Sequence, residues 1–311
     1  MMRGESVVLE IAAGVADERS GLACSPEVRF QLASVSKQFT AAAILLLADQ
    51  GGLSVDDPVT RWLTGCPSSW RSMTIHHLLT HTAGLPHWLD EIPGMDPTSH
   101  LDAATEMRLF QAAPLRSVPG DCWHYSSPGY VLLAHIVQRA ADQPYGGFLD
   151  TQLFRPLGMA STFVGNGSGR DRLASGYCDG APVPSFELDV FNLGAGDVWS
   201  TVANVARWDA ALATGSILGE ASRRAMLEIQ AVVPGDAVGE TGLLTVDGYA
   251  YGWFIGTAFG RRVIYHPGDN AGFVALNAWF PDDDLRFVVL SNEETTDLEA
   301  LLPELLAELA S

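Results

Sequence analysis

Several features that mark other classes of protein are missing from this sequence. Its 18 Lys and Arg residues face 37 Asp and Glu residues, so the formal net charge is −19. That shortage of positive charge argues against nucleic acid and anionic membrane surfaces as partners. No apolar run reaches the roughly 18 residues of a membrane span, and the opening "MMRGESVVLEIAAG" is broken by Glu10 and lacks a cleavage site. We therefore expect a cytoplasmic protein, and nothing in the sequence indicates its oligomeric state.

Cysteine is scarce, and its spacing excludes some chemistry. The chain has four cysteines and no CxxC pair, so neither a zinc ribbon nor thioredoxin-like chemistry is expected; they are Cys24, Cys66, Cys122 and Cys178. We predict four reduced, mostly buried thiols. In "IHHLLTH", His77 and His81 have the spacing of zinc ligands on a helix, but no HExxH glutamate accompanies them. The sequence predicts neither a metal nor a cofactor.

The remaining composition is that of a globular protein without repeats or linkers. Of 311 residues, 47% are apolar and 18% are charged, which is ample for a sizeable core. Apolar patterning and turn signals predict helices at 35–50, 74–81, 102–113, 130–142 and 201–214, with Thr201 as a candidate cap of the last one. β-rich runs predict strands at 5–12, 251–256, 261–266, 272–280 and 285–291, with "HPGDNAG" and "PDDD" as turns between the later ones. A leucine stripe between Leu298 and Leu309 predicts a final helix that packs on the sheet.

This order of elements predicts an α/β protein of the α+β type. The short connections of the C-terminal strands imply antiparallel neighbours. We expect one catalytic domain over 1–311, with a sheet subdomain from about 1–52 and 197–311 and an inserted helical subdomain from about 53–196. A ligand cleft is expected where the two parts meet.

A serine and a lysine three residues apart stand at the start of the first long helix. In "FQLASVSKQFTAAAILLLADQGG", this spacing places Ser34 and Lys37 on one helical face. Apolar surroundings and the positive end of the helix dipole lower the pKa of a lysine. Such a lysine can activate a serine hydroxyl as a nucleophile. The alternative is an N-cap serine followed by a surface lysine.

Two further segments give this pair a context. Tyr125 lies in "PGDCWHYSSPGYVLLAHIV", and His266 lies in "YHPGDNAGF". With the Ser34 segment they resemble the serine β-lactamase-like family, which comprises class C β-lactamases, D,D-peptidases and their esterase and transesterase relatives. The similarity covers roughly residues 28–295 and includes "IHHLLTHTAGL", "PLGMAST" and "GAGDVWSTVANVARW" in the family order.

The resemblance implies a β-lactamase-like fold and a role for each matching residue. Ser34 would be the acyl-accepting nucleophile, Lys37 would tune the proton network, and Tyr125 would be a general base whose phenol is acidified by the lysine charge. Which of Lys37 and Tyr125 holds the proton is left open, because their titrations are coupled. His266, Pro267 and Gly268 would form the third motif, and the backbone N–H groups of Ser34 and Asp269 would form the oxyanion hole.

Two departures from the family pattern bear on the substrate. The second motif is Tyr125-Ser126-Ser127, with Ser127 where the family's asparagine would contact the substrate carbonyl, and the third has His266 in place of lysine. A neutral histidine binds a substrate carboxylate poorly. We therefore expect a serine hydrolase for an ester or simple amide of a small metabolite, and a poor β-lactamase. The alternatives are an acyltransferase that uses an amine or alcohol acceptor and an inactive binding protein on the same fold.

Other residues near these motifs allow more than one interpretation. Trp88 and Trp123 either line an acyl pocket or pack in the core. Gly194 and Gly196, in "GAGDVWS", are expected to form a tight turn near the cleft.

Overall fold

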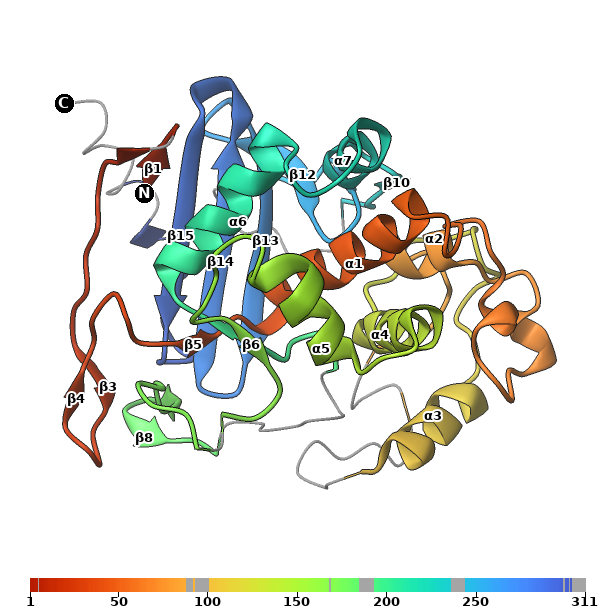
Figure 1. Ribbon diagram of the computed structural model, residues 1–311, viewed down its shortest axis with the longest axis horizontal. Helices are drawn as coiled ribbons and strands as arrows, with labels where there is room; N and C mark the ends of the chain where they lie inside the picture. The colour runs from red at the N-terminus through yellow and green to blue at the C-terminus, as the bar shows by residue number, and fades with distance from the viewer. Residues whose placement is uncertain are drawn as a thin grey trace.

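The computed structural model contains one large antiparallel sheet with helices packed against it (Figure 1). It describes residues 1–4, 6–87, 92, 101–167, 169–184, 193–235, 244–298, 300, 301 and 303. The strand order is β10-β11-β12-β13-β14-β15-β1-β2, so both ends of the chain contribute to one sheet. These strands are β10 (Ala231–Val232), β11 (Gly248–Tyr249), β12 (Phe254–Ala258), β13 (Arg261–Asn270), β14 (Phe273–Phe280), β15 (Leu285–Ser291), β1 (Met2–Arg3) and β2 (Ser6–Val7). The predicted α+β class is confirmed.

The longest strand, β13, extends further than the sequence predicted. It pairs with β14 from Ile264 opposite Trp279 to Asn270 opposite Phe273. The expectation of a turn over "HPGDNAG" was therefore wrong in its position, because the ladder continues to Asn270. The chain reverses only afterwards, at Gly272, whose φ of +77° is a conformation that favours glycine. A Cβ there would also lie 2.6 Å from the Cα of Gly176, so close backbone packing fixes this turn.

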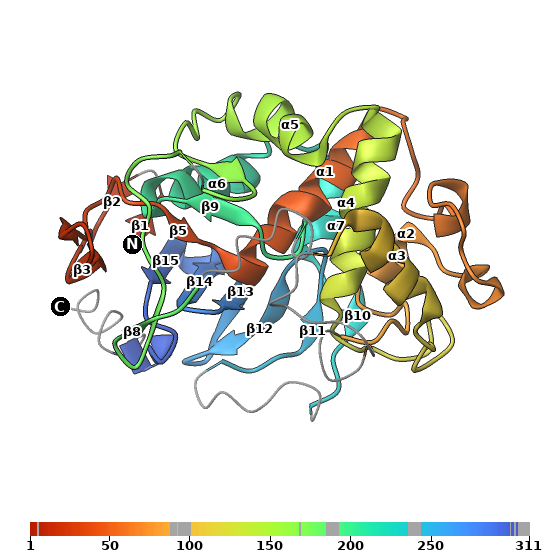
Figure 2. The same ribbon diagram turned by 90° about the horizontal axis from the view of Figure 1, so that it is seen from below.

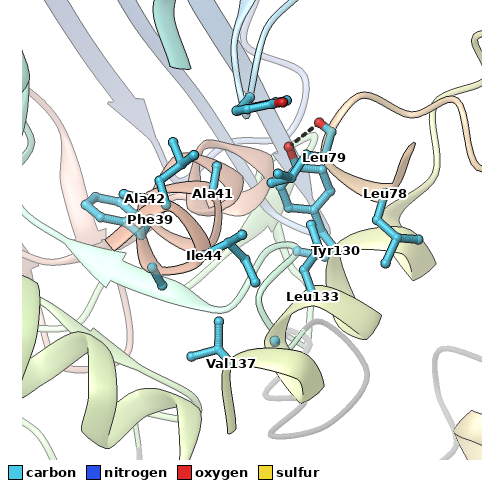
Figure 3. Packing of buried hydrophobic residues seen from close by; sticks show 14 of the residues in the cluster. Phe39, Ala41, Ala42, Ile44, Leu78, Leu79, Tyr130, Leu133 and Val137 are labelled. Atoms are coloured by element: carbon cyan, nitrogen blue, oxygen red, sulfur yellow. Dashed lines mark hydrogen bonds between the residues drawn. The ribbon is translucent and has the colours of Figure 1, made fainter. Parts of the chain in front are cut away.

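Helix α1 (Lys37–Asp49) lies between the large sheet and α4 (Ser127–Ala141), as Figures 1 and 2 show. A short 3-10 turn, η1 (Ala33–Ser36), precedes it. The helix is apolar all round, which is typical of a buried helix. Figure 3 shows Phe39, Ala41, Ala42 and Ile44 of this helix packed near residues of α4 (Ser127–Ala141) and α2 (Ile75–Leu79). The core thus holds the start of α1 in a fixed position.

The other helices begin at side-chain caps in several places. The side chains of Thr74, Asp102, Ser126 and Thr201 accept a hydrogen bond from the backbone at the first turn of α2, α3 (Ala103–Ala112), α4 and α6 (Val202–Thr214), respectively. The cap predicted at Thr201 is thereby confirmed. Helix α6 crosses the sheet over β15 (Figure 1). The remaining helices are α5 (Tyr145–Leu149), which continues into the π-helical turn η4 (Asp150–Phe154), and α7 (Glu220–Leu227).

A second, smaller sheet joins the nucleophile segment to a distant part of the chain. Its order is β5-β9-β6, with β5 (Phe30–Gln31), β9 (Val198–Ser200) and β6 (Phe163–Val164). Two hairpins lie outside both sheets, β3 (Val15–Asp17) with β4 (Leu22–Ala23), and β7 (Tyr177–Cys178) with β8 (Ala181–Pro182). Short 3-10 turns occur at Val59–Arg61, Ser68–Trp70 and Pro281–Asp283.

Some expectations need correction or lie outside the described residues. Of the strand predicted at 5–12, only Ser6 and Val7 pair in the sheet, and the run "YGWFIG" becomes a strand only at Phe254. The cysteines are free, as predicted, but Cys122 is exposed and the other three are half-buried. Most of the C-terminal leucine stripe and Trp88 lie outside the described residues. None of the helices in the described part of the chain is long and apolar enough to cross a bilayer.

Candidate active site

The turn that carries Ser34 is tied to β9 and has unusual backbone geometry. Leu32 N–H donates to the Val198 carbonyl at 2.8 Å, and Val198 N–H donates to Ser36 Oγ at 3.0 Å. Between them, Ala33 has a φ of +46°, a left-handed conformation that costs an L-residue free energy and persists where the surrounding structure enforces it. Ser34 follows directly and is half-buried, whereas its neighbours in the turn are buried. The fold therefore leaves the Ser34 side chain as the accessible one in this turn.

Strand β13 passes so close to this turn that only glycine fits at position 268. A Cβ on Gly268 would lie well under 3.0 Å from the Leu32 carbonyl oxygen and 3.1 Å from Ala33 Cβ. Both neighbours are rigid, because one is backbone and the other is the first atom of a side chain. The third motif is therefore in van der Waals contact with the serine turn, and Asp269 is the next residue along the same strand.

Lys37 is completely buried at the first position of α1. Its Nζ donates to Ser34 Oγ at 2.9 Å, to Ser127 Oγ at 3.1 Å and to the Ala195 carbonyl at 2.8 Å. An ammonium group has one N–H for each of these three partners, whereas a neutral amine keeps two N–H bonds and offers its lone pair to the Ser34 hydroxyl. Lys37 is also the only lysine in the 311 residues. The predicted serine–lysine pair thus exists as a direct hydrogen bond, and the alternative of a surface lysine is excluded.

Burial strongly perturbs the charge state of this lysine. Desolvation holds the pKa of Lys37 well below its ordinary value, and the nearby Asp197 carboxylate acts in the opposite direction. Asp197 is itself buried and directly precedes β9. The direction agrees with the expectation from the apolar sequence around Lys37, and the lowered pKa makes the neutral amine more accessible than it is in an exposed lysine.

Tyr125 lies beside the lysine, as the motifs predicted. The Lys37 Nζ is 5.0 Å from the centroid of its ring. Burial raises the pKa of the Tyr125 phenol, while interactions with the hydroxyls of Ser34 and Ser127 act to lower it. The expectation that the lysine charge would acidify this phenol was therefore wrong, because the loss of water around the ring outweighs the favourable contacts. Tyr125 is a neutral phenol in the free protein.

The second motif continues into the start of α4. Ser126 Oγ donates to the Pro86 carbonyl at 2.9 Å and accepts from Gly129 N–H at 3.3 Å, so it caps the helix. Ser127 begins the helix and is buried, with its Oγ on Lys37. Ser127 therefore belongs to the hydrogen-bond network of the lysine, where the sequence suggested a substrate contact.

The His266 ring is held by two hydrogen bonds within the protein, and it is neutral. Its Nδ1 donates to the Pro267 carbonyl at 2.6 Å, because a carbonyl can only accept. Its Nε2 then accepts from the Tyr249 hydroxyl at 3.0 Å. Burial, reinforced by the charge on Lys37, lowers the pKa of His266 to about 3. A neutral histidine at this position agrees with the expectation from the sequence, although both ring nitrogens are already in use and the side chain is 1% exposed.

Several residues of this site had no recognisable signal in the sequence. The Ala195 carbonyl reaches Lys37 across 158 positions of chain, and it lies in the tight turn that "GAGDVWS" predicted, where Gly194 has a φ of +73°. Asp197 follows in the same turn. Backbone acceptors leave no mark in a sequence, so only the turn itself could be anticipated.

Two alternative interpretations of aromatic and histidine residues are decided by their packing. Trp123 is 8% exposed and contacts Tyr249 and Phe254 in a buried aromatic cluster, which favours core packing over an acyl pocket. His77 and His81 do not share a helical face, because α2 ends at Leu79 and His81 has a φ of +59°. Among the described residues, no cluster of three His, Cys, Asp or Glu could hold a metal ion.

A serine, a buried lysine and a tyrosine brought together between a sheet strand and a helical block define a serine β-lactamase-type site. The chain belongs to the β-lactamase family, whose model matches residues 1–311. Penicillin-binding protein 4* of Bacillus subtilis is 32% identical over 87% of this chain and 62% of its own length. Esterase EstB of Burkholderia gladioli is 37% identical over 58% of this chain and 50% of its own length. The chain thus matches less than two thirds of either relative.

Solved structures agree with this assignment. The penicillin-binding protein of Bacillus halodurans has a TM-score of 0.84 and 26% identity, and the match covers 98% of this chain and 94% of that one. EstCE1, described as a hydrolase with promiscuous acyltransferase activity, has a TM-score of 0.79 over 97% of this chain and 90% of its own, and at 23% identity it supports the fold alone.

Proposed function

We propose that this protein is a serine hydrolase that cleaves an ester or simple amide of a small molecule through an acyl-enzyme on Ser34. The observation that carries the proposal is the 2.9 Å hydrogen bond between Ser34 Oγ and the buried Nζ of Lys37. A half-exposed hydroxyl bonded to an amine of lowered pKa is the arrangement that nucleophilic catalysis requires.

The proton path follows from the two pKa directions. Lys37, as a neutral amine, takes the proton of Ser34 while Oγ attacks the acyl carbonyl. Tyr125 is a neutral phenol in contact with the same hydroxyl, so it passes a proton to the departing alcohol or amine and recovers one through Lys37. Water then repeats the sequence on the acyl-enzyme. The backbone N–H groups of Ser34 and Asp269 are the proposed donors to the oxyanion.

The charges around the site favour a substrate without a carboxylate. His266 is neutral, buried and bonded at both nitrogens. Lys37 is buried, and its Nζ is already engaged in hydrogen bonds with three protein groups. Neither can supply the charge-assisted hydrogen bond that a carboxylate substrate would gain from a free cation, and such bonds are roughly twice as strong as neutral ones. A neutral ester has no carboxylate to bind, so the absence of a free cation does not weaken its binding.

The test compares two substrates and one variant. We expect kcat/KM to be higher for short-chain p-nitrophenyl esters than for nitrocefin, which bears a carboxylate. A fluorophosphonate should add one label, detected by intact mass, and Ser34→Ala should remove both label and turnover. Comparable or faster turnover of nitrocefin would refute the substrate assignment. Persistent labelling of the Ser34→Ala protein at another residue would refute the nucleophile.

Acyl transfer is the second candidate, because the chain shares its fold with EstCE1, a hydrolase described as having promiscuous acyltransferase activity. Hydrolysis and transfer share the acyl-enzyme and differ only in the acceptor, so the geometry of Ser34 and Lys37 serves both. An added amine or alcohol that changes the product of ester turnover would favour transfer. A chain that the fluorophosphonate never labels would instead be the inactive binding protein on this fold.

A further inference from the structure

Residues 80–87, which follow α2, pack along the second motif. His124 N–H donates to the His81 carbonyl at 2.8 Å, and Gly120 N–H donates to the Thr82 carbonyl at 2.8 Å. A Cβ on Gly84, whose φ is +72°, would clash with the Ser117 carbonyl. The two segments are therefore joined by backbone contacts along the residues that precede Tyr125.

Two imidazoles of this segment hold the backbone of the second motif. Ser126 N–H donates to His81 Nδ1 at 3.1 Å, and Ser127 N–H donates to His87 Nδ1 at 3.2 Å. The two N–H groups follow Tyr125 directly, at the start of α4, where backbone donors have no partner within the helix. The His81 ring also lies 4.4 Å from the Tyr125 ring, centroid to centroid. One side chain thus contacts both the ring and the following peptide of the proposed proton carrier.

We infer that His81 is a positioning residue for acylation, because its Nδ1 fixes the peptide that joins Tyr125 to Ser126 and thereby the place of the phenol beside Ser34. His87 supports the next peptide in the same way. This inference rests on the proposed function, since it concerns the geometry of that reaction.

The hydrogen bond dictates the chemical state of His81. A backbone N–H can only donate, so Nδ1 must carry the lone pair and the proton of the neutral ring must be on Nε2. Nε2 has no hydrogen-bond partner in the described part of the chain, and the Tyr249 ring is 4.6 Å away. In an imidazolium, an Nδ1–H donor would face the Ser126 N–H donor, and their hydrogen bond would be lost. The titratable groups around the ring are Lys37, His87, His124, His266, Tyr125, Tyr130 and Tyr249.

The electrostatic surroundings keep the ring neutral. Burial lowers the pKa of His81 well below its ordinary value, and the positive charge of Lys37 acts in the same direction. His81 is therefore a fixed acceptor over the working pH range and does not act as a switch.

The backbone conformation of His81 allows a clean pair of substitutions. Its φ of +59° suits asparagine and glycine among the twenty residues. His81→Asn keeps an acceptor near the place of Nδ1, whereas His81→Gly keeps the backbone and removes the acceptor. His77→Ala is the matched control, because His77 Nδ1 also accepts a backbone N–H, that of Thr74 at 3.2 Å, but it does so in the cap of α2.

The first measurement is the rate of acylation by a p-nitrophenyl ester in a single turnover. A misplacement of about 1 Å can cost about 100-fold, so we expect a loss of that order in His81→Gly with KM within about 3-fold of the parent. His81→Asn should recover at least about 10-fold of the loss, and His77→Ala should acylate at the parent rate within about 3-fold. Equal rates in His81→Asn and His81→Gly, or an unimpaired His81→Gly, would overturn the inference.

The second measurement does not depend on activity. In protein labelled with ¹⁵N-histidine, the NMR signals of His81 should show a bare Nδ1 and a protonated Nε2 from about pH 5.5 to 8.5, on either side of the ordinary histidine pKa. A proton on Nδ1, or an imidazolium in that range, would overturn the positioning role. If the parent protein were not acylated at all, the proposed function would fail, and this spectrum would still decide whether His81 holds Ser126.

Discussion

Adding one methyl group at Gly268 tests the contact between the third motif and the nucleophile turn. The methyl of Gly268→Ala would overlap the Leu32 carbonyl oxygen and lie 3.1 Å from Ala33 Cβ. Restoring an ordinary contact with that oxygen requires a relative shift of about 1 Å, since non-bonded heavy atoms are most stable at about 3.5–4.0 Å. Neither neighbour can turn aside, so β13 and the Ser34 turn must separate.

The expected cost follows from that shift. A displacement of about 1 Å at a reacting group can lower the rate by about 100-fold. Because Ser34 lies in the turn that must move, the loss should appear in the acylation rate and much less in substrate affinity. Single-turnover acylation by an activated ester, followed by intact mass, measures the rate directly.

The control is Gly147→Ala, because a Cβ at Gly147 would have no heavy atom within 4 Å. This variant should keep the parent rate and gain slightly in stability, since alanine costs less entropy in a helix than glycine. A Gly268→Ala protein that is folded and acylates within a few-fold of the parent would refute the claim that β13 sets the position of the serine turn.

Two other groups give predictions of different kinds. Tyr125→Phe should lower the acylation rate by about 10²–10⁴-fold with little change in KM, because it removes the proton carrier and keeps the ring; an unaffected single-turnover rate would show that another group carries the proton. Burial raises the pKa of Asp209 to about 7 from 3.8, so between those values the folded protein binds the extra proton and stability falls as pH rises. The loss in the free energy of unfolding between these pH values approaches about 4 kcal/mol. Asp209→Asn keeps an acceptor for the 2.8 Å bond from Asn277, so it should be more stable than the parent protein at pH 8 in urea titrations. Equal pH slopes for parent and variant would contradict this.

The parts of the fold that the sequence predicted are those with strong local patterns. The all-apolar run of α1, the cap at Thr201 and the β-rich runs of β14 and β15 reflect short-range preferences, and the structure contains each of them. The end of β13 was missed because Gly268 and Asn270 carry turn propensities that the pairing with β14 overrides. In that strand, glycine is required by the approach to Leu32 and not by a turn.

The candidate site was predictable as far as its residues form short motifs. Ser34, Lys37 and Tyr125 come together as expected, and Ser127 joins them. The role of His81 was not predictable, because an acceptor for a backbone N–H 45 positions away has no sequence pattern. The spacing of His77 and His81 even suggested another chemistry.

The composition of the chain gives the buried lysine a further meaning. Of its 18 basic residues, one is lysine and the other 17 are arginine. Arginine keeps its proton under all ordinary conditions, whereas a lysine can lose one when it is desolvated. The chain thus has its single lysine at the one position where the proposed mechanism needs an amine that can accept a proton from Ser34.

This uniqueness makes the charge state of Lys37 directly measurable. Protein labelled with ¹⁵N-lysine has a single Nζ to report, and its titration should give a pKa well below 10.5, the ordinary value, because burial lowers it. Since the neutral amine is the active form, acylation should rise with pH through the same midpoint. Lys37→Arg keeps a cation and cannot release its proton, so it should not be acylated. An Nζ that stays protonated up to its ordinary pKa while acylation proceeds at pH 7 would show that Lys37 acts only as a cation, and the base would then have to be Tyr125.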